Sequence, residues 1–277
     1  MSQSKLCPFC RGLNSVTERR CYRCGRPLPG PLASGLIGTF KNTLGADAAM
    51  TRLFVGLCLV VFALCVASEH RLPIWGGQAF LRSTMLRFGA IAGTLAQVQP
   101  WRYFSAIFVH FDLLHVGMNC WVLVSVGAAA ERELGKARFA VLFVLTGAIG
   151  FLVSDWWALS DCTAGASGAV FGLFGAVIGV AYARRDPNWK QILAQNVVWI
   201  LILGFMGSVN NAAHAGGLIA GAALGFLFSK EPRKLNLDTA FAAVAVVLVV
   251  VSLASVVLSA ASPIWRQLRT VERSQLY

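Results

Sequence analysis

Long apolar runs separated by short polar segments dominate the chain after residue 50. The runs cover residues 51–68, 112–130, 137–154, 167–183, 191–207, 211–228 and 239–262. A helix of about 17–25 apolar residues can cross a bilayer, whereas a barrel strand has only about ten alternating residues. Helices and closed barrels are the two structures that satisfy the backbone in lipid. The pattern therefore predicts an all-α polytopic membrane protein with seven spans.

The remaining segments define the domain organisation. Residues 1–30 form a polar, basic module with cysteines, and residues 31–50 form a linker rich in small residues. Residues 51–229 hold a six-helix core, and residues 230–277 hold the seventh span and a polar tail. Residues 69–111 mix aromatic residues with four arginines, which predicts an interfacial loop with in-plane helices.

Composition and charge support a membrane location. Hydrophobic residues make up 57% of the chain and charged residues 13%, whereas a soluble domain has roughly 25% charged residues. The net charge of +12 could indicate nucleic acid as a partner. The basic residues, however, lie in the N-terminal module and in short loops, where they determine membrane orientation. We therefore do not expect a nucleic-acid partner.

The distribution of Lys and Arg predicts how the chain is oriented. The N-terminal module and the turns after the second, fourth and sixth runs are basic, whereas the turns after the third and fifth runs contain no Lys or Arg. The positive-inside rule then places the N-terminus in the cytoplasm and the C-terminus outside, with a bacterial inner membrane as the expected location. The arginines of the long first loop depart from the rule, and interfacial arginines can contact lipid phosphates.

Ser167 lies in Gly165-Ala166-Ser167-Gly168, where an outside turn enters the fourth span. Backbone N–H groups at a helix N-terminus can stabilise an oxyanion. His214 lies at the corresponding depth of the sixth span, which also enters from outside. Each motif taken alone also fits helix packing or a local hydrogen bond. Glycines recur every three or four residues in both spans, which would let the two helices come into close contact and bring serine and histidine together.

The second span adds His115 and Asn119, which share a helix face and have side chains that can donate hydrogen bonds to an oxyanion. An ordinary hydrogen bond between helices is the alternative for this pair. Phe171, one turn after Ser167, could stack on His214 or simply pack against neighbouring helices or lipid. None of the nearby acidic residues Asp112, Asp155 and Asp161 has a position typical of a third triad member. The sequence therefore predicts a Ser–His dyad.

Together these motifs resemble the rhomboid family of intramembrane serine proteases over roughly residues 52–228. The matching segments are Trp101-Arg102, His115-x-x-x-Asn119, Glu131-Arg132-Glu133-Leu134-Gly135, Gly165-Ala166-Ser167-Gly168 and Ala213-His214-Ala215-Gly216-Gly217. The resemblance implies six helices around a water-filled cavity open to the outside.

The resemblance also implies roles for individual residues. Ser167 would be the nucleophile and His214 the general base. Asn119, His115 and the Ser167 backbone N–H would form the oxyanion hole, and Phe171 would stack on the histidine. The implied substrates are single-span membrane proteins, cut near the outer end of a helix that unwinds easily.

The N-terminal module contains two C-x-x-C pairs, Cys7 with Cys10 and Cys21 with Cys24. Four thiolates at this spacing can hold Zn²⁺ in a ribbon-like module. Two disulfides are the alternative, which a reducing cytoplasm disfavours. All four ligands would be used, so the zinc would be structural, and catalysis would need no cofactor. The purpose of the module stays open among binding of nucleic acid, binding of a cytoplasmic protein partner and self-stabilisation.

Three other functions compete with proteolysis. A rhomboid-like protein could bind transmembrane helices without cutting them, but it should lack the serine or the histidine. A transporter or channel should have charges deep within its spans or inverted repeats, and neither is evident. An anchor for the zinc module would need one span and not seven.

Overall fold

The computed structural model describes residues 4–6, 13–15, 18, 20–25, 48–75, 79–157, 162–205, 210–230 and 237–274, without the side chains of 4–6, 13, 196, 199–205 and 273. The chain divides into two compact units, Met1–Ala46 and Asp47–Tyr277. The predicted linker, apart from its last residues, and the cysteines Cys7 and Cys10 lie outside the described residues.

The first unit contains a small antiparallel hairpin. Strand β1 (Ser4–Leu6) pairs with strand β2 (Leu13–Ser15). The side chain of Asn14 joins the hairpin to the following turn, because its Oδ1 accepts the Tyr22 N–H (3.1 Å) and its Nδ2 donates to the Cys21 Sγ (3.6 Å). The Gly25 N–H donates to the Cys21 carbonyl (2.8 Å), and the φ of +69° at Gly25 suits glycine. The second C-x-x-C pair therefore lies in a tight turn.

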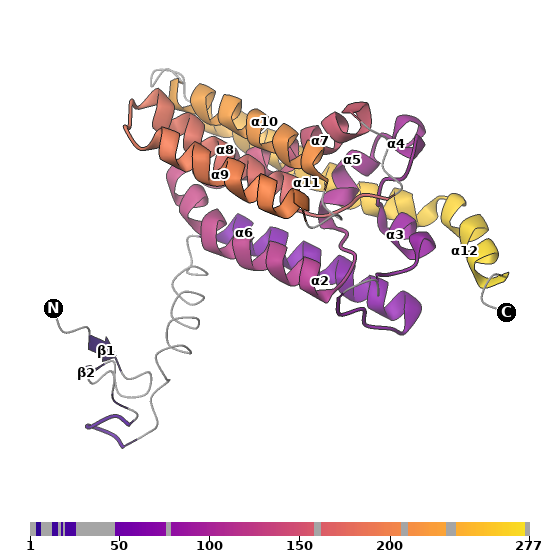
Figure 1. The fold of residues 1–277 in the computed structure, drawn as a ribbon, viewed down its shortest axis with the longest axis horizontal. Helices are drawn as coiled ribbons and strands as arrows, with labels where there is room; N and C mark the ends of the chain where they lie inside the picture. Colours follow the sequence, from indigo (N-terminus) through magenta and orange to yellow (C-terminus); the bar gives the residue numbers. More distant parts are fainter. Residues whose placement is uncertain are drawn as a thin grey trace. The chain divides into compact units, whose positions relative to one another are not determined.

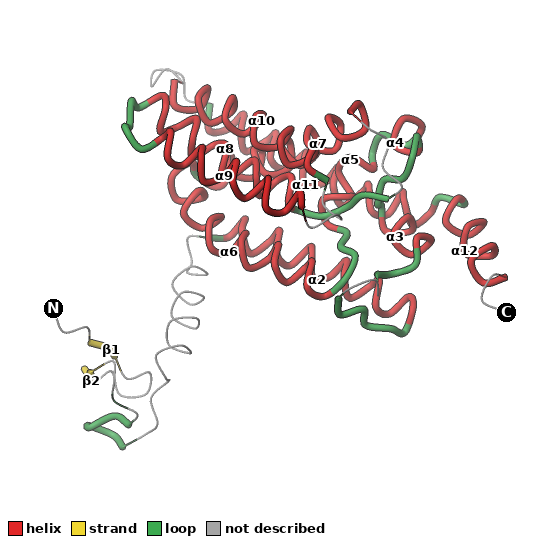
Figure 2. The backbone as a smooth tube through the Cα atoms, viewed as in Figure 1, coloured by secondary structure: helices red, strands yellow, loops and turns green. Residues whose placement is uncertain are grey.

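The second unit is built from helices, as Figures 1 and 2 show. Its long helices are α2 (Ala49–Glu69), α6 (Leu113–Leu134), α7 (Lys136–Trp157), α8 (Ser167–Ala183), α9 (Trp189–Phe205), α10 (Asn211–Lys230) and α11 (Asp238–Ala261). Its short helices are α3 (Arg82–Phe88), α4 (Leu95–Val98), α5 (Arg102–Ser105), the 3₁₀ helix η1 (Ala106–Phe108) and α12 (Ile264–Ser274).

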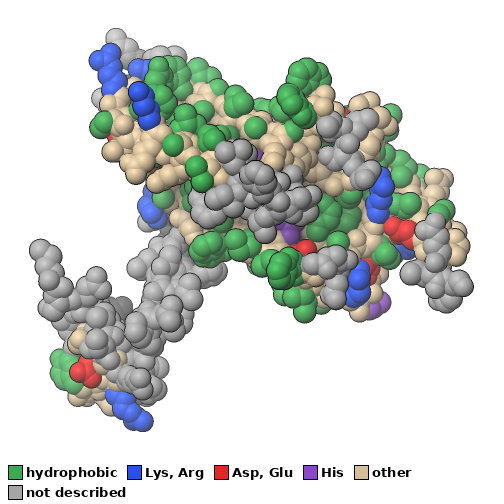
Figure 3. All heavy atoms as spheres, viewed as in Figure 1, with side chains coloured by type: hydrophobic (Ala, Val, Ile, Leu, Met, Phe, Trp, Pro, Cys, Tyr) green, Lys and Arg blue, Asp and Glu red, His purple; other side chains and the backbone are tan. Residues whose placement is uncertain are grey.

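The helices occupy the predicted apolar runs. Within the described residues, α2, α6, α7, α10 and α11 are long and apolar enough to cross a membrane, and α8 is a shorter apolar helix. Large apolar side chains such as Val60 on α2 and Val246 on α11 are exposed, and Figure 3 shows patches of hydrophobic side chains along the surface of the helical unit. An apolar exterior on long helices is the surface that a lipid environment requires.

The segment between α2 and α6 contains the short helices α3, α4, α5 and η1, in agreement with the helical loop expected there. The sequence did not predict α12, which follows α11 after Ser262 and Pro263. Residues 263–277 have the composition of a polar tail beyond the last span. Its apolar positions Ile264, Leu268 and Val271 repeat at helical spacing, and this pattern is the signal that could have revealed the helix.

Helix α8 lies among α6, α7, α9 and α10. It runs parallel to α10, and the two backbones touch at glycines. A Cβ atom at Gly217 would collide with the carbonyl oxygen of Gly168, and one at Gly221 would collide with that of Gly172. Glycine is therefore required at these positions by the close approach of the two helices. The glycines spaced along α8 and α10 lie at this contact, as the sequence predicted.

Two buried charged side chains, Glu131 and Arg102, connect separate elements of the helical unit. The carboxylate of Glu131 on α6 accepts hydrogen bonds from the N–H groups of Met50 (3.0 Å) and Thr51 (2.8 Å) and from the Thr51 hydroxyl (2.9 Å). It therefore satisfies donors at the N-terminus of α2, where a negative charge is also favoured.

Arg102 is the second of these side chains. Its Nη1 donates to the carbonyls of Leu86 and Ala90 (2.8 Å each), and its Nε donates to the Gln99 Oε1 (2.7 Å). Burial lowers the pKa of Arg102 to about 10, so the guanidinium stays charged near neutral pH. Both charged residues belong to motifs that the sequence singled out, and both connect elements of the helical unit.

Candidate active site

The structure brings Ser167 and His214 together. Ser167 is the first residue of α8, and His214 lies in the first turn of α10. The Ser167 Oγ and the His214 Nε2 are 2.7 Å apart, which is hydrogen-bond distance. The histidine side chain is buried, with 3% of the residue exposed. A serine and a histidine in this geometry can act as a nucleophile and its base.

Phe171 lies against the ring of His214. The two ring centroids are 4.4 Å apart and the planes meet at 31°. Phe171 is one turn after Ser167 on α8, so this contact follows from helical spacing. The imidazole is therefore bounded by the Ser167 hydroxyl and by an aromatic face.

No acidic side chain in the described part of the chain contacts the other ring nitrogen of His214. Its Nδ1 is buried and has no hydrogen-bond partner there. Asp112 accepts the His115 N–H at the start of α6 (2.8 Å), and Asp155 accepts the Tyr103 hydroxyl (2.7 Å). Asp161 lies outside the described residues. Within the described residues, no third carboxylate therefore joins the serine–histidine pair.

The loop before Ser167 is fixed by contacts with the segment that precedes α6. The Gly165 N–H donates to the Ala106 carbonyl (2.9 Å), and Thr163 pairs with Ile91 in an isolated β-bridge. Gly165 has a φ of +130°, and a Cβ atom there would lie 2.8 Å from the Nε2 of His115. Only glycine suits both the backbone conformation and the close approach of this ring.

His115 and Asn119 lie on the side of α6 that carries this contact. The His115 Nδ1 accepts the Phe111 N–H (3.4 Å), which leaves Nε2 as the protonated nitrogen, next to Gly165. The Asn119 Nδ2 donates to the His115 carbonyl of its own helix (2.9 Å). Among the described residues, no hydrogen bond joins Asn119 to Ser167. The structure therefore brings His115 to the serine loop and leaves Asn119 bonded to its own helix.

His110 also contacts the serine loop, and the sequence did not single it out. Its Nε2 accepts the Ala166 N–H (3.4 Å), so its Nδ1 is the nitrogen that donates to the Phe108 carbonyl (3.2 Å). Burial lowers the pKa of His110 well below its usual value, and the neighbouring His115 lowers it further. The neutral imidazole required by these two hydrogen bonds is thus the stable form. The sequence signal that could have revealed His110 is its position five residues before His115.

Asn210 fixes the start of α10. Its Oδ1 accepts the Ala213 N–H (3.0 Å), as an N-cap side chain does. Its Nδ2 donates to the hydroxyls of Ser154 on α7 (2.5 Å) and of Thr163 in the serine loop (3.0 Å). One amide therefore links the helix that carries His214 to α7 and to the loop that leads to Ser167. An N-cap residue four positions before the histidine was visible in the sequence, but its two long-range partners were not.

Helix α8 is short for a helix that crosses a bilayer. Helix α8 has 17 residues, which corresponds to about 25 Å at 1.5 Å per residue. That length is below the roughly 30 Å thickness of a bilayer core. If its C-terminal end is at one surface, its N-terminal residue Ser167 lies recessed below the other. The arrangement defines a helical membrane protein with a serine–histidine pair at the N-terminal ends of two neighbouring helices.

Comparisons with known proteins agree with this class. The pattern of the rhomboid domain matches residues 97–231, a range that includes the serine–histidine site. Rhomboid-like protease 3 of Toxoplasma gondii is 31% identical over 199 residues, which are 68% of this chain and 72% of that protein. The chain belongs to the rhomboid family, and it is a multi-pass membrane protein.

Two other relatives are longer than the matched region. Rhomboid protease GluP of Bacillus subtilis is 36% identical over 184 residues, which are 63% of this chain and 34% of GluP. RHOMBOID-like protein 5 of Arabidopsis thaliana is 34% identical over 165 residues, which are 54% of this chain and 51% of that protein. The chain thus spans about a third of the length of GluP and about half of the length of RHOMBOID-like protein 5.

The hydrogen bonds of Asn210 lead to a test of how His214 is positioned. Asn210→Ala should lower the rate of fluorophosphonate labelling about tenfold, the equivalent of about 1.4 kcal/mol in the barrier, because α10 loses its N-cap and its links to α7 and the serine loop. Asn210→Asp keeps the cap and should restore part of the rate. Labelling of the purified variants in mild detergent measures the effect.

The neighbouring Asn211 is exposed and provides a matched control. Asn211→Ala should label at the wild-type rate. If Asn210→Ala also labelled at the wild-type rate, Asn210 would have no part in positioning His214.

Proposed function

We propose that this chain is an intramembrane serine endopeptidase that cuts transmembrane helices of single-span membrane proteins near the outer face. The observation that carries the proposal is the 2.7 Å separation of the Ser167 Oγ and the His214 Nε2. Membership of the rhomboid family supports it, as do the names of relatives such as rhomboid protease GluP.

The first half of the proposed reaction acylates the serine. The Ser167 Oγ attacks the scissile carbonyl carbon while the His214 Nε2 takes the hydroxyl proton. The carbonyl oxygen becomes an oxyanion. It is within reach of the backbone N–H groups at the start of α8, and His115 has a protonated Nε2 beside the same loop. When the intermediate collapses, the C–N bond breaks and His214 gives its proton to the leaving amine.

The second half of the reaction hydrolyses the acyl-enzyme. Water attacks the ester while His214 accepts its proton, and the proton returns to the Ser167 Oγ when the new carboxyl product leaves. Asn119 would join the oxyanion hole only if its amide turned from the His115 carbonyl (2.9 Å) toward the bound substrate. We propose that substrate binding causes this change.

We propose that packing contacts, and not a carboxylate, hold the His214 ring in its orientation. In the triad of soluble serine proteases a carboxylate bonds the Nδ1 and holds the ring. Here the Nδ1 has no partner among the described residues, and Phe171 lies at 4.4 Å from the ring centroid. The aromatic contact and the N-cap by Asn210 are the groups that we propose hold the ring in place of a carboxylate.

The substrate class follows from the location of the site. Peptide hydrolysis requires water, so the serine must be reached from an aqueous surface, and a site recessed beneath one surface meets this need. A transmembrane helix hides its carbonyl groups in backbone hydrogen bonds. Segments with helix-breaking residues open at a lower free-energy cost and would be preferred. We propose seven spans with a cytoplasmic N-terminus, in accord with the distribution of Lys and Arg.

The function is tested by substrate cleavage in liposomes. The wild-type chain and a single-span substrate are reconstituted together, and the products are mapped by mass spectrometry. We expect a cut in the outer half of the substrate helix and none with Ser167→Ala, because the nucleophile is lost. The control Ser125→Ala, whose hydroxyl donates to the Trp121 carbonyl of its own helix (2.8 Å), should cut at the wild-type rate.

Two outcomes would contradict the proposal. Equal cleavage by Ser167→Ala would exclude this serine as the nucleophile. A panel of substrates that bind to the wild-type chain but stay uncut would indicate a helix-binding rhomboid relative without catalysis.

We also propose that the N-terminal module binds one structural zinc ion through Cys7, Cys10, Cys21 and Cys24. Within the described residues, Cys21 is buried and its Sγ accepts an N–H from Asn14, and such a hydrogen bond would orient a thiolate toward a metal ion. Cys7 and Cys10 lie outside the described residues. Four thiolates complete the tetrahedral coordination of zinc, which leaves no open position for catalysis.

The metal content of the purified full-length chain tests the zinc proposal. We expect about one zinc ion per chain by elemental mass spectrometry and less than a tenth of that in Cys21→Ser, because a ligand is lost. The control Cys120→Ser, on α6, should keep its zinc. A zinc-free wild-type chain, or unchanged zinc in Cys21→Ser, would refute the assignment.

A further inference from the structure

Helix α12 begins directly after α11, which has the highest mean hydropathy of the five long apolar helices within the described residues. Only Ser262 and Pro263 separate the end of α11 from Ile264. A helix that follows a spanning helix this closely must start at the membrane surface. Its apolar residues Ile264, Leu268 and Val271 repeat at the spacing of one helical face, as in a helix that lies in the plane of the interface.

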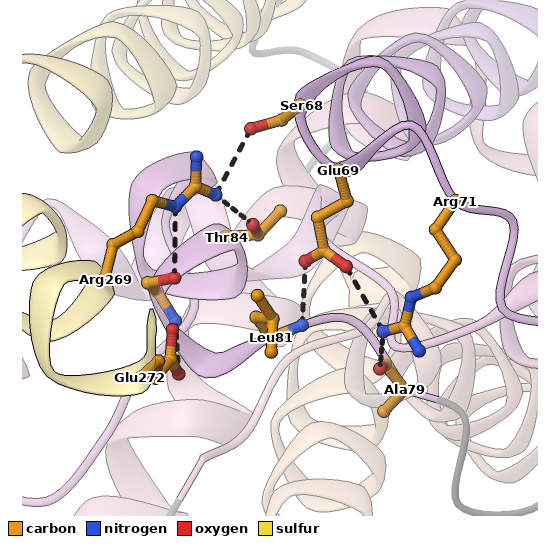
Figure 4. A network of polar contacts seen from close by, with 9 residues as sticks. Ser68, Glu69, Arg71, Ala79, Leu81, Thr84, Arg269 and Glu272 are labelled. Carbon is orange, nitrogen blue, oxygen red and sulfur yellow. Dashed lines mark hydrogen bonds and ion pairs between the residues drawn. The ribbon is translucent and has the colours of Figure 1, made fainter. Parts of the chain in front are cut away.

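One face of α12 is held on α3 by a polar network, drawn in Figure 4. The Arg269 guanidinium donates to the hydroxyls of Thr84 (2.5 Å) and Ser68 (3.4 Å), which belong to α3 and to the end of α2. The Glu272 carboxylate accepts the Ser83 N–H at the start of α3 (3.2 Å). These contacts fix the position of α12 beside the loop that precedes α6.

A groove of about 690 Å³ lies between α12 and the segment that contains α3 and α4. Its volume is in the range of about 300–1,000 Å³ found for ligand sites. Most of its lining is apolar, and the side chains that matter here are Leu86, Leu95, Val98, Leu268 and Val271. Val98 and Val271 are 72% and 52% exposed. An exposed apolar lining of this kind at a membrane surface suits a hydrocarbon chain.

The groove also contains one cationic side chain, Arg82. It is exposed at the first residue of α3 and makes no hydrogen bond or ion pair within the described residues. A guanidinium binds a phosphate through two parallel N–H···O bonds. Thr94 and Gln267 add polar groups to the same lining. The groove thus combines a phosphate donor with an apolar channel, which is the chemistry of a phospholipid.

We propose that this groove binds one glycerophospholipid of the surrounding bilayer, with its phosphate on Arg82 and an acyl chain between α4 and α12. None of the lining residues belongs to the serine–histidine site, so the proposal does not depend on catalysis. The bound lipid would join the seventh span and α12 to the loop before α6. That loop also holds the residues that contact the serine loop, such as Ala106 and Ile91.

Native mass spectrometry of the full-length chain in mild detergent with added phosphatidylglycerol tests the site. We expect Arg82→Gln to weaken binding of the tightest lipid about tenfold, because a charge-assisted contact with phosphate is lost. The matched control is Arg266→Gln on α12, an exposed arginine outside the groove, and it should bind as the wild type does. Diacylglycerol with the same chains, which has no phosphate, should bind at least tenfold more weakly.

A second pair of variants tests the acyl channel. Val271→Trp fills the groove and should also weaken binding about tenfold, whereas Thr270→Trp, next to it but outside the lining, should not. Wild-type affinity in Arg82→Gln and Val271→Trp would overturn the proposal. An equal loss in Arg266→Gln would do so too, because it would indicate general attraction of charge to the helix.

Discussion

The direct backbone contact between α8 and α10 is the constraint on which the site depends. Glycines on both helices remove the side chains that would separate them, and a Cβ atom at Gly217 or Gly221 would collide with a carbonyl oxygen of α8. In a bilayer no hydrophobic effect drives helices together, so close van der Waals packing at small residues provides the attraction. Because the two helices run parallel from the same end, their first turns hold Ser167 and His214 at 2.7 Å.

The neighbouring elements determine how precisely this pair is held. The serine loop is attached to the segment before α6 through Ala106, Ile91 and His110, and the start of α10 is attached to α7 and to the same loop through Asn210. These bonds are made by neutral groups. A carboxylate on His214 would carry a desolvation cost inside the helical unit. A ring held by Phe171 and by a capped helix avoids that cost.

Much of this arrangement could be predicted from the sequence, because its signals are local. Apolar runs mark the helices, and matched depth with recurring glycines predicts that Ser167 and His214 meet. The features that were missed depend on partners far away in the chain. The side chains of Asn210 and Glu131 bond to partners on other elements. Helix α12 has only 11 residues, so its pattern of apolar residues repeats too few times to give a clear helical signal. The hydrogen bond from Asn119 to the His115 carbonyl of its own helix was not predictable. The position of Asn119 on a helix face allows its amide to bond either to its own helix or to a group across the site.

Fluorophosphonate labelling of the purified chain tests the central claim most directly, since it requires an activated serine but no knowledge of the substrate. Wild type, Ser167→Ala and His214→Ala would be treated in mild detergent and in liposomes. We expect labelling of the wild type that disappears in both variants. Labelling of Ser167→Ala equal to that of the wild type, or a wild type that stays unlabelled in both settings, would contradict it.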